Sequence, residues 1–320
     1  MSNIILNKSL INKRMKIAVI GTGGVGGYFG GKIAHAGFDV TFLARGKHFK
    51  SIKENGLTVK SILGDFKIDT VNVTDTIKDI GLVDIIILGV KAWQVKEIAD
   101  QLKYIIKEDT IILPLQNGVL AAEELKEKID EKHVIGGLCR IISKIDSEGV
   151  INHFGLTPTN LFGEFSLEKT NRIYKIKELF DIAGIHSNIS EDITSDLWKK
   201  FMAICVSGLL AVSRTTYGEM RELKETRQLM VDLLSEIYLL SQKVGIQIEN
   251  DFLDKTISFI DSFPYESTSS LTRDVWEGKP SEIEYQNGTV VKLAKKYGVD
   301  TPVNKFIYNC ILPMELKARK

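Results

Sequence analysis

A glycine-rich segment near the start of the chain has the residue types and spacing of a phosphate-binding loop. Gly21-Thr22-Gly23-Gly24-Val25-Gly26 follows an apolar run and precedes a helix-like stretch that ends at Gly37. In such a loop the first glycine permits a tight turn, the second lets the backbone approach a pyrophosphate, and the third lets helix and strand pack closely. The helix N-terminus supplies free N–H groups and a positive dipole end. The segment therefore predicts dinucleotide binding, and a purely structural glycine turn is the alternative.

The residue after the second apolar run bears on the choice of cofactor. Arg45 follows residues 40–44, at the place where NAD-binding proteins carry an acidic residue for the ribose 2′-hydroxyl. A guanidinium binds a 2′-phosphate in bidentate fashion, whereas a carboxylate would repel it. Lys47 and His48 add positive character nearby. Arg45 thus predicts NADPH as the cofactor, and an ordinary solvated arginine is the competing interpretation.

Alternating β-branched and amphipathic segments predict the domain that positions this loop. From Met15 to about Ser190 they indicate βαβ units and a mostly parallel sheet. Strands are expected at residues 16–20, 40–44, 85–90, 111–115 and 134–138. Residues 149–154 and 160–163 flank a Thr157-Pro158 turn and predict an antiparallel hairpin at the sheet edge.

After Glu191 the apolar spacing becomes helical. Helices are expected over residues 197–210, 222–244 and 280–297, with Gly245 and Gly298 as left-handed caps and Pro302 as the stop of another segment. The predicted fold class is an α/β Rossmann-type N-terminal domain, residues 15–190, followed by an all-α substrate and catalytic domain, residues 191–320, that closes the active site. Residues 1–14 are expected to be an N-terminal extension.

Composition narrows the function classes. The 42 basic and 41 acidic side chains among 320 residues give a net charge of +1, which favours neither nucleic acid nor a membrane surface as partner. No stretch approaches the ~18 apolar residues of a membrane span, and residues 1–14 make a poor secretory signal. Cys139, Cys205 and Cys310 lack disulfide or zinc spacing, so no metal site and a reducing, cytoplasmic setting are expected. A homodimer is compatible with the sequence.

At Lys91-Ala92-Trp93-Gln94 the chain resembles the ketopantoate reductases (2-dehydropantoate 2-reductases), and the resemblance extends over nearly its whole length. The residues that carry it are the glycine motif, Arg45, Gln116-Asn117-Gly118, Leu197-Trp198-Lys199-Lys200, Ser269-Ser270 and Glu282-Ile283-Glu284-Tyr285 with Asn287-Gly288. This resemblance implies NADPH-dependent reduction of a 2-keto acid, 2-dehydropantoate to pantoate or a close analogue, in pantothenate biosynthesis. It also places Lys91 and Gln94 near the adenosine ribose and phosphate, and Asn117 near the nicotinamide ribose and the substrate.

The same resemblance assigns the catalytic residues. Hydride delivery to a ketone leaves negative charge on its oxygen, so a proton donor is needed beside that oxygen. Lys200 matches the family lysine in this role, and Lys199 points about 100° around the helix from it. Glu282 matches the glutamate that holds the substrate hydroxyl, and Ser270 matches a serine that contacts the substrate carboxylate. Only one of Lys199 and Lys200 can face the cleft, and because Glu282 and Glu284 face different directions on a helix, one of these two acids is expected to be solvent-facing.

Four positions depart from the family pattern. Ile204 and Gly208, four and eight residues after Lys200, stand where the family carries asparagines, as do Tyr217 and Ser267. Substrate recognition is therefore expected to be altered, with Ser207, Tyr217 and Ser267 as candidates for other polar contacts. The alternatives are a related reductase acting on a different keto acid or an imine, and a non-catalytic NADPH-binding sensor. Lys200 and Glu282 argue against the sensor, which needs no proton donor.

Overall fold

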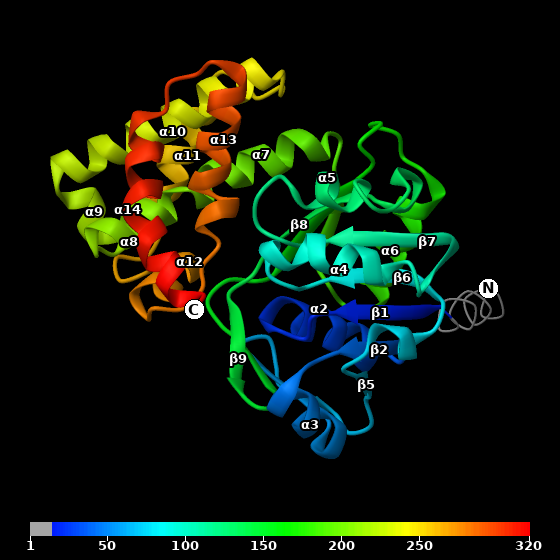
Figure 1. Ribbon diagram of the computed structural model, residues 1–320. Helices are drawn as coiled ribbons and strands as arrows, with labels where there is room; N and C mark the ends of the chain where they lie inside the picture. Colours follow the sequence, from blue (N-terminus) through cyan, green and yellow to red (C-terminus); the bar gives the residue numbers. More distant parts are fainter. Residues whose placement is uncertain (1–14) are drawn as a thin grey trace. The chain divides into compact units, whose positions relative to one another are not determined.

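The computed structural model describes residues 15–320 and divides into two compact units (Figure 1). The first unit runs to Gln116 and resumes over Ala121–Ile193, and the second comprises Asn117–Leu120 and Thr194–Lys320. The expected N-terminal extension, residues 1–14, lies outside the described residues. In the described part of the chain, no helix has both the length and the apolar character to cross a bilayer.

A five-stranded parallel sheet lies at the centre of the first unit. Its strands, in spatial order, are β5 (Asn72–Thr74), β2 (Asp39–Leu43), β1 (Lys16–Ile20), β6 (Val83–Leu88) and β7 (Ile106–Pro114). Ile17 and Val19 of β1 face one apolar cluster, while Ala18 and Ile20 face another, because successive strand residues point to opposite faces. Both faces are therefore covered, which explains why β1 is apolar at every position after Lys16.

Helices cover both faces of this sheet. One apolar cluster includes residues of α2 (Gly24–His35) and α6 (Asn171–Ile182), and the other includes residues of α4 (Val95–Leu102) and α5 (Ala121–Lys126). The connections also hold α3 (Gly46–Asn55) and the short 3₁₀ turns η1 (Ile77–Ile80), η2 (Ala92–Gln94) and η3 (Glu131–His133). This is the Rossmann-type arrangement that the sequence predicts.

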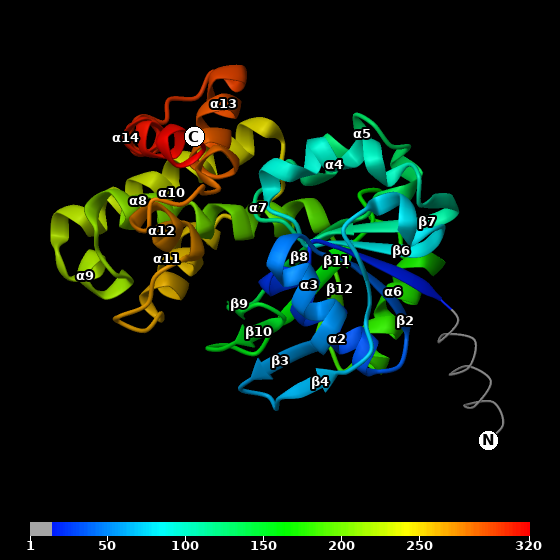
Figure 2. The ribbon, with the colours of Figure 1, turned by 60° about the horizontal axis from the view of Figure 1, so that its bottom comes forward.

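Two smaller sheets complete the first unit. Their strand order differs from the pairing predicted from the sequence. The first has the order β4 (Phe66–Ile68), β3 (Leu57–Ser61), β10 (Val150–His153), β9 (Ser143–Ser147), and its strands lie side by side in Figure 2. The second has the order β12 (Ser187–Ile189), β11 (Thr159–Gly163), β8 (Gly136–Arg140).

The predicted hairpin between residues 149–154 and 160–163 is therefore wrong. Strand β10 pairs antiparallel with β9 and parallel with β3, whereas β11 pairs antiparallel with β8 and parallel with β12. The expected strand at residues 134–138 likewise begins at Gly136 and runs antiparallel to β11, and only Val134 bridges β7 in parallel. A turn signal in the sequence identifies where a strand ends. Which strand it pairs with depends on packing with segments that are distant in the sequence.

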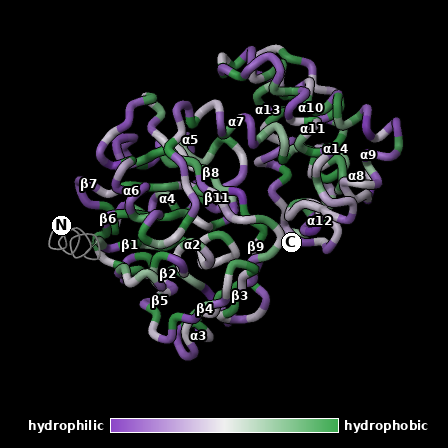
Figure 3. Tube along the Cα trace, turned by 180° about the vertical axis from the view of Figure 1, so that it is seen from behind, coloured by the Kyte–Doolittle hydropathy of each residue, from purple (hydrophilic) through white to green (hydrophobic). Residues whose placement is uncertain are grey.

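The second unit is helical and has its own apolar core. Its helices are α7 (Ile193–Ile204), α8 (Val206–Ser213), α9 (Tyr217–Glu222), α10 (Lys224–Val244), α11 (Phe252–Asp261), α12 (Ser270–Trp276), α13 (Asn287–Tyr297) and α14 (Pro302–Ala318), with the 3₁₀ turn η4 (Ile283–Tyr285). Hydrophobic and hydrophilic residues are interspersed along these helices (Figure 3). Gly245 and Gly298 end α10 and α13 in left-handed conformations, as expected, with φ of 91° and 67°. Pro302 begins α14 instead of ending a segment.

The long helices predicted in this unit are shorter than expected. The helix predicted over 197–210 breaks at Cys205, whose carbonyl oxygen accepts a hydrogen bond from Nδ2 of Asn287 at 3.2 Å. The one predicted over 280–297 breaks at Gln286, which has φ −114° and ψ −104°. At the start of α10, Leu223 is extended, so Glu222 belongs to α9 instead. The partner of the Cys205 carbonyl is 82 positions away in the sequence, and helical periodicity gives no sign of it.

Candidate active site

The glycine loop is the turn between β1 and α2. Gly21 has φ +96°, and a Cβ added there would lie 2.7 Å from the Val90 nitrogen. A Cβ on Gly26 would lie 2.1 Å from the Gly21 carbonyl oxygen. Both glycines are thus required by the close approach of loop, helix and neighbouring strand. Gly24 is similarly constrained, because its Cβ would lie 2.4 Å from the carbonyl oxygen of Ser143 in β9.

Gly23 differs from these three glycines, and its surroundings suit a ligand. No heavy atom lies within 4 Å of a Cβ built on Gly23. It precedes α2 without a side-chain cap, and the first turn of α2, which includes half-buried Val25, carries no acidic residue. A helix start with free N–H groups and no carboxylate is a favourable place for phosphate oxygens. The loop therefore fits the pyrophosphate of a dinucleotide.

His48 holds this loop in place, which sequence reasoning missed. The Thr22 backbone N–H and hydroxyl both donate to the Leu43 carbonyl, at 3.1 and 2.9 Å. The Thr22 carbonyl faces Nε2 of His48 at 2.8 Å, and the Gly149 N–H donates to Nδ1 of His48 at 3.0 Å. Because Nδ1 accepts, the ring proton of the neutral imidazole lies on Nε2, which donates to Thr22.

His48 therefore does not contribute the positive character expected from the sequence. Burial lowers its pKa below the ordinary 6.5, although the Thr22 carbonyl and the charge of Glu148 act in the opposite direction. No local motif signals this role, because the second hydrogen bond comes from the turn before β10. The neutral ring links the glycine loop to that turn.

A pH dependence of stability follows from this arrangement. The unfolded chain binds a proton at His48 more readily than the folded protein, so the free energy of unfolding should fall as the pH drops below 6.5. His48→Gln keeps an N–H donor for Thr22 and cannot titrate, so its stability should fall less over the same interval. Denaturant unfolding of both proteins at several pH values from neutral to mildly acidic checks this. Parallel profiles would contradict the assignment.

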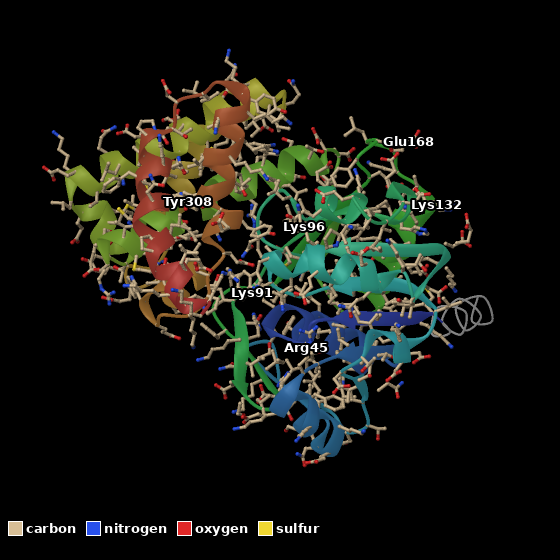
Figure 4. The ribbon with its side chains drawn as sticks, in the orientation of Figure 1. Arg45, Lys91, Lys96, Lys132, Glu168 and Tyr308 are labelled. Atoms are coloured by element: carbon tan, nitrogen blue, oxygen red, sulfur yellow. The ribbon has the colours of Figure 1, made fainter. Side chains whose placement is uncertain are left out.

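Three further predicted cofactor residues follow strands of the same sheet. Arg45 comes after β2 as the exposed residue preceding α3, and Lys91 is the exposed residue preceding η2 (Figure 4). The Lys91 N–H donates to Oε1 of Gln94 at 3.1 Å, so these two residues lie together. Ligands of parallel α/β sheets bind beyond the carboxyl ends of the strands, where these residues are.

Gln116 fixes the turn that carries Lys91. Its Nε2 donates to the carbonyls of Leu88 and Val90, at 3.0 and 3.1 Å. The amide thus ties the end of β7 to the end of β6. Its place in the Gln116-Asn117-Gly118 motif has a structural explanation.

Asn117 and Glu282 are brought together within the second unit. Nδ2 of Asn117 donates to Oε2 of Glu282 at 3.1 Å, although 165 positions separate them in the sequence. Gly118, with φ +96°, allows the approach, because a Cβ there would lie 2.8 Å from the Tyr285 carbonyl oxygen. Glu282 is only 5% exposed. A buried carboxylate held by an amide is a fixed hydrogen-bond acceptor.

The backbone beside Glu282 is clamped from α14. The N–H and hydroxyl of Ser281 donate to Oε2 of Glu315, at 2.8 and 2.6 Å. Nε of Arg319 pairs with the other Glu315 oxygen at 2.5 Å, and Nη2 of Arg319 donates to the Ser281 carbonyl at 3.3 Å. Nothing in the sequence pattern singles out Ser281 or Glu315. Together these bonds hold the backbone at Ser281, the residue before Glu282.

Glu284 is the exposed member of the two acids and is bonded elsewhere in the unit. Its Oε1 accepts a hydrogen bond from the Tyr308 hydroxyl at 2.7 Å. Glu282 precedes the 3₁₀ turn η4, and Glu284 lies within it. The two acids therefore serve different parts of the unit.

The two adjacent lysines of α7 have different surroundings. Nζ of Lys199 lies 2.8 Å from the Glu249 carboxylate and 5.4 Å from the Phe252 ring centroid. Lys200 is half-buried and lies about 100° around the helix. Ser270 is the exposed first residue of α12, and the neighbouring Ser269 caps that helix by accepting the Thr272 N–H at 3.0 Å.

Four positions depart from the family pattern: Ile204, Gly208, Tyr217 and Ser267. They carry few polar groups available to a ligand. A Cβ on Gly208 would lie 2.4 Å from Oδ1 of Asn287, so this glycine is required by helix packing. Burial raises the pKa of Tyr217 to about 12, against the opposing hydrogen bond with Ser207. The Tyr217 N–H donates to the Ser267 carbonyl at 3.0 Å, while the Ser267 hydroxyl donates to the Pro264 carbonyl at 2.5 Å. Ile204 packs partly buried against the core of the unit.

No cluster of three or more His, Cys, Asp or Glu residues suited to a metal occurs between residues 15 and 320.

Comparison with known proteins identifies the family. The family model described as "Ketopantoate reductase PanE/ApbA" matches residues 17–166. The model for the C-terminal part of the same family matches residues 192–315.

Similar proteins cover nearly the whole chain. The chain is 30% identical to the "Uncharacterized oxidoreductase YkpB" of Bacillus subtilis over 297 residues, covering 92% of this chain and 97% of that one. It is 31% identical to a 2-dehydropantoate 2-reductase of Nostoc sp. over 306 residues, covering 93% and 94% of the two chains.

Solved structures with a similar fold also cover nearly the whole chain. The 2-dehydropantoate 2-reductase of Geobacter metallireducens has 27% identity and a TM-score of 0.87, over 93% of this chain and 99% of that one. A D-mandelate dehydrogenase solved with NADH and anilino(oxo)acetate, at 22% identity, shares the fold, with a TM-score of 0.86 over 95% of this chain and 99% of that one. The Rossmann-type first unit, the helical second unit and the two family matches show that this chain belongs to the ketopantoate reductase family of oxidoreductases.

Proposed function

We propose that the protein uses NADPH to reduce a 2-keto acid, 2-dehydropantoate or a close analogue, to the corresponding 2-hydroxy acid. The observation that carries this proposal is the hydrogen bond between Asn117 and Glu282, which holds a buried carboxylate ready to accept a hydrogen bond. Residues 15–190 would bind the dinucleotide and residues 191–320 the substrate. Relatives named 2-dehydropantoate 2-reductase support the reaction class.

The first unit would bind the dinucleotide. The open backbone at Gly23 and the start of α2 suit the pyrophosphate, with Gly21, Thr22, Gly24, Val25 and Gly26 completing the loop. Arg45 would take the 2′-phosphate, and Lys91 and Gln94 the adenosine side. When bound, the nicotinamide supplies the hydride.

Lys200 would act as the general acid. As negative charge develops on the keto oxygen, an ammonium group stabilises it and then transfers a proton from Nζ to that oxygen. Glu282 would accept a hydrogen bond from the nascent substrate hydroxyl, and Asn117 keeps its carboxylate oriented. Ser270 would contact the substrate carboxylate. The alkoxide oxygen receives the Nζ proton, so the product is the neutral 2-hydroxyl.

The direct test is NADPH oxidation measured against a panel of 2-keto acids that includes 2-dehydropantoate, with cyclic imines as a second panel. Turnover of at least one keto acid is expected. NADPH binding without turnover of any keto acid or imine would favour the sensor. Turnover of imines alone would move the protein to a different reductase class.

Cofactor selectivity gives a separate prediction. Arg45→Ala should weaken NADPH binding by about 1.5–3 kcal/mol, roughly 10- to 150-fold, because a charged hydrogen bond to the 2′-phosphate is lost. NADH binding should hardly change, because NADH lacks that phosphate. Fluorescence titration of both cofactors measures this, with Lys47→Ala as the control at a neighbouring exposed cation. Equal affinity of the unaltered protein for NADPH and NADH would contradict the prediction.

A further inference from the structure

We infer that Asn304, a fully buried side chain of α14, is a positioning residue for the proposed reduction. Through a chain of hydrogen bonds it holds the helix that carries Lys200 against the segment that carries Glu282. This inference rests on the proposed function, since it takes these two side chains as the groups that act on the substrate. All of the residues concerned belong to the second unit.

The carboxylate of Glu236, on α10, sets the orientation of the Asn304 amide. Its Oε1 accepts the Val303 N–H at 2.8 Å, and its Oε2 accepts both the backbone N–H and Nδ2 of Asn304, at 3.0 and 2.7 Å. Nδ2 of Asn304 also donates to the Leu233 carbonyl at 3.2 Å. Both amide hydrogens of Asn304 are thus used on α10, so its Oδ1 can only accept a hydrogen bond from elsewhere.

Asn287 joins this amide to the end of the lysine-bearing helix. Its Nδ2 donates to Oδ1 of Asn304 at 2.9 Å and to the Cys205 carbonyl at 3.2 Å, between the last residue of α7 and the first of α8. Gly208 allows this approach, because a Cβ there would lie 2.4 Å from Oδ1 of Asn287. Since an amide nitrogen donates and a carbonyl oxygen accepts, the orientation of Asn304 dictates that of Asn287.

The two segments joined in this way carry the two proposed catalytic side chains. Cys205 follows Lys200 by five residues, and Asn287 follows Glu282 by five residues. The bond between Asn287 and the Cys205 carbonyl therefore ties the end of α7 to the segment that holds the buried acid. A misplacement of about 1 Å between reacting groups costs roughly 10²-fold in rate, so the loss of this tie is expected to lower kcat.

Helix α14 holds the acid-bearing segment on both sides of Glu282. Asn304 binds Asn287, which comes after Glu282, and Glu315 accepts the N–H and hydroxyl of Ser281, which comes before it. Asn304 and Glu315 are about three helical turns apart, so they lie on one face of α14, and both are buried. This buried face thus fixes both ends of residues 281–287 and, through Asn287, the end of α7.

Asn304→Leu keeps the size of the side chain and removes the link. We expect kcat on the best keto acid to fall about 10- to 100-fold, because Lys200 and Glu282 lose their fixed separation. The dissociation constant of NADPH should stay close to normal, because the proposed phosphate and adenosine contacts lie in the first unit. Steady-state kinetics and fluorescence titration measure the two quantities, at a temperature at which circular dichroism shows the variant to be fully folded.

Ile311→Ala is the matched control. Ile311 is fully buried, about two turns from Asn304 on the same face of α14, and its hydrocarbon side chain has no part in the hydrogen-bond chain. Its truncation leaves a cavity and should lower Tm, while kcat of the folded enzyme stays near normal. If Asn304→Leu also lowers Tm and keeps a normal kcat, or if Ile311→Ala loses as much kcat as Asn304→Leu, the inference is overturned.

Asn287→Ser breaks the same link from its other end. Alone it should lower kcat as Asn304→Leu does, and the double variant should lose no more than either single variant, because the effects of breaking one shared link do not add. Additive losses would overturn the inference. Should Asn304→Leu fail to fold, a normal kcat in Asn287→Ser overturns it equally. These outcomes leave the proposed function intact, whereas an unaltered protein that reduces no keto acid would overturn both.

Discussion

Lys200→Ala should lose about 10²–10⁴-fold in kcat on the best keto acid, the range that general acid catalysis supplies. NADPH binding should change little, because the phosphate and ribose contacts proposed for the cofactor lie at the glycine loop, Arg45, Lys91 and Gln94. Steady-state kinetics and a separate cofactor titration distinguish a chemical defect from a binding defect.

Lys199→Ala is the matched control for this prediction. Its ammonium pairs with Glu249, 2.8 Å away, on the segment before α11. A partly exposed ion pair contributes about 1 kcal/mol or less to stability, so activity should remain near normal. A Lys200→Ala enzyme that keeps more than half of normal kcat would refute the assignment. A large loss in Lys199→Ala instead would transfer the role to that lysine.

Glu282→Ala should raise KM and lower kcat together, with a combined loss of about 10²-fold or more. The carboxylate is expected to orient the substrate oxygen beside Lys200, and a misplacement of about 1 Å costs roughly 10²-fold in rate. Asn117→Ala should have a smaller effect in the same direction, because the carboxylate remains but loses the amide that holds it.

Glu284→Gln provides the control for this acid. Glu284 lies two residues further along and bonds to the Tyr308 hydroxyl, so its replacement should leave KM close to normal. Circular dichroism and NADPH binding exclude a folding defect in each variant. If Glu284→Gln loses activity and Glu282→Ala does not, the substrate contact belongs to the other glutamate.

The central elements of the fold could be predicted because their sequence signals are local. Strand β1 has the predicted bounds, since an apolar run followed by a glycine turn leaves few alternatives. The pairing of β10 and β11 was not predictable, because period-two alternation fixes which face a residue occupies and not which strand lies beside it. The interruption at Cys205 depends on an amide from Asn287, which only the folded chain brings near.

The candidate site shows the same division between local and remote information. Motif spacing predicts the glycines and Arg45 as site residues, and the family resemblance predicts Asn117, Lys200 and Glu282. The residues that hold these site residues in position lie far away in the sequence. His48 accepts a hydrogen bond from the Gly149 N–H, and Glu315 holds the residue before Glu282. A side chain whose role depends on a distant hydrogen-bond partner carries no local signature.

The short segment Asn117–Leu120 has a consequence for the modularity of this protein. The chain enters the second unit at Asn117, returns to the first at Ala121, and enters the second again at Thr194. Val119 packs against the helical core, and Asn117 bonds to Glu282. A gene cut once between residues 193 and 194 would therefore leave the helical fragment without a part of its own core and without the amide beside its buried acid. Recombination between relatives at that point would preserve the unit only if residues 117–120 of one parent fit residues 194–320 of the other, so the two halves are expected to be inherited as a matched pair.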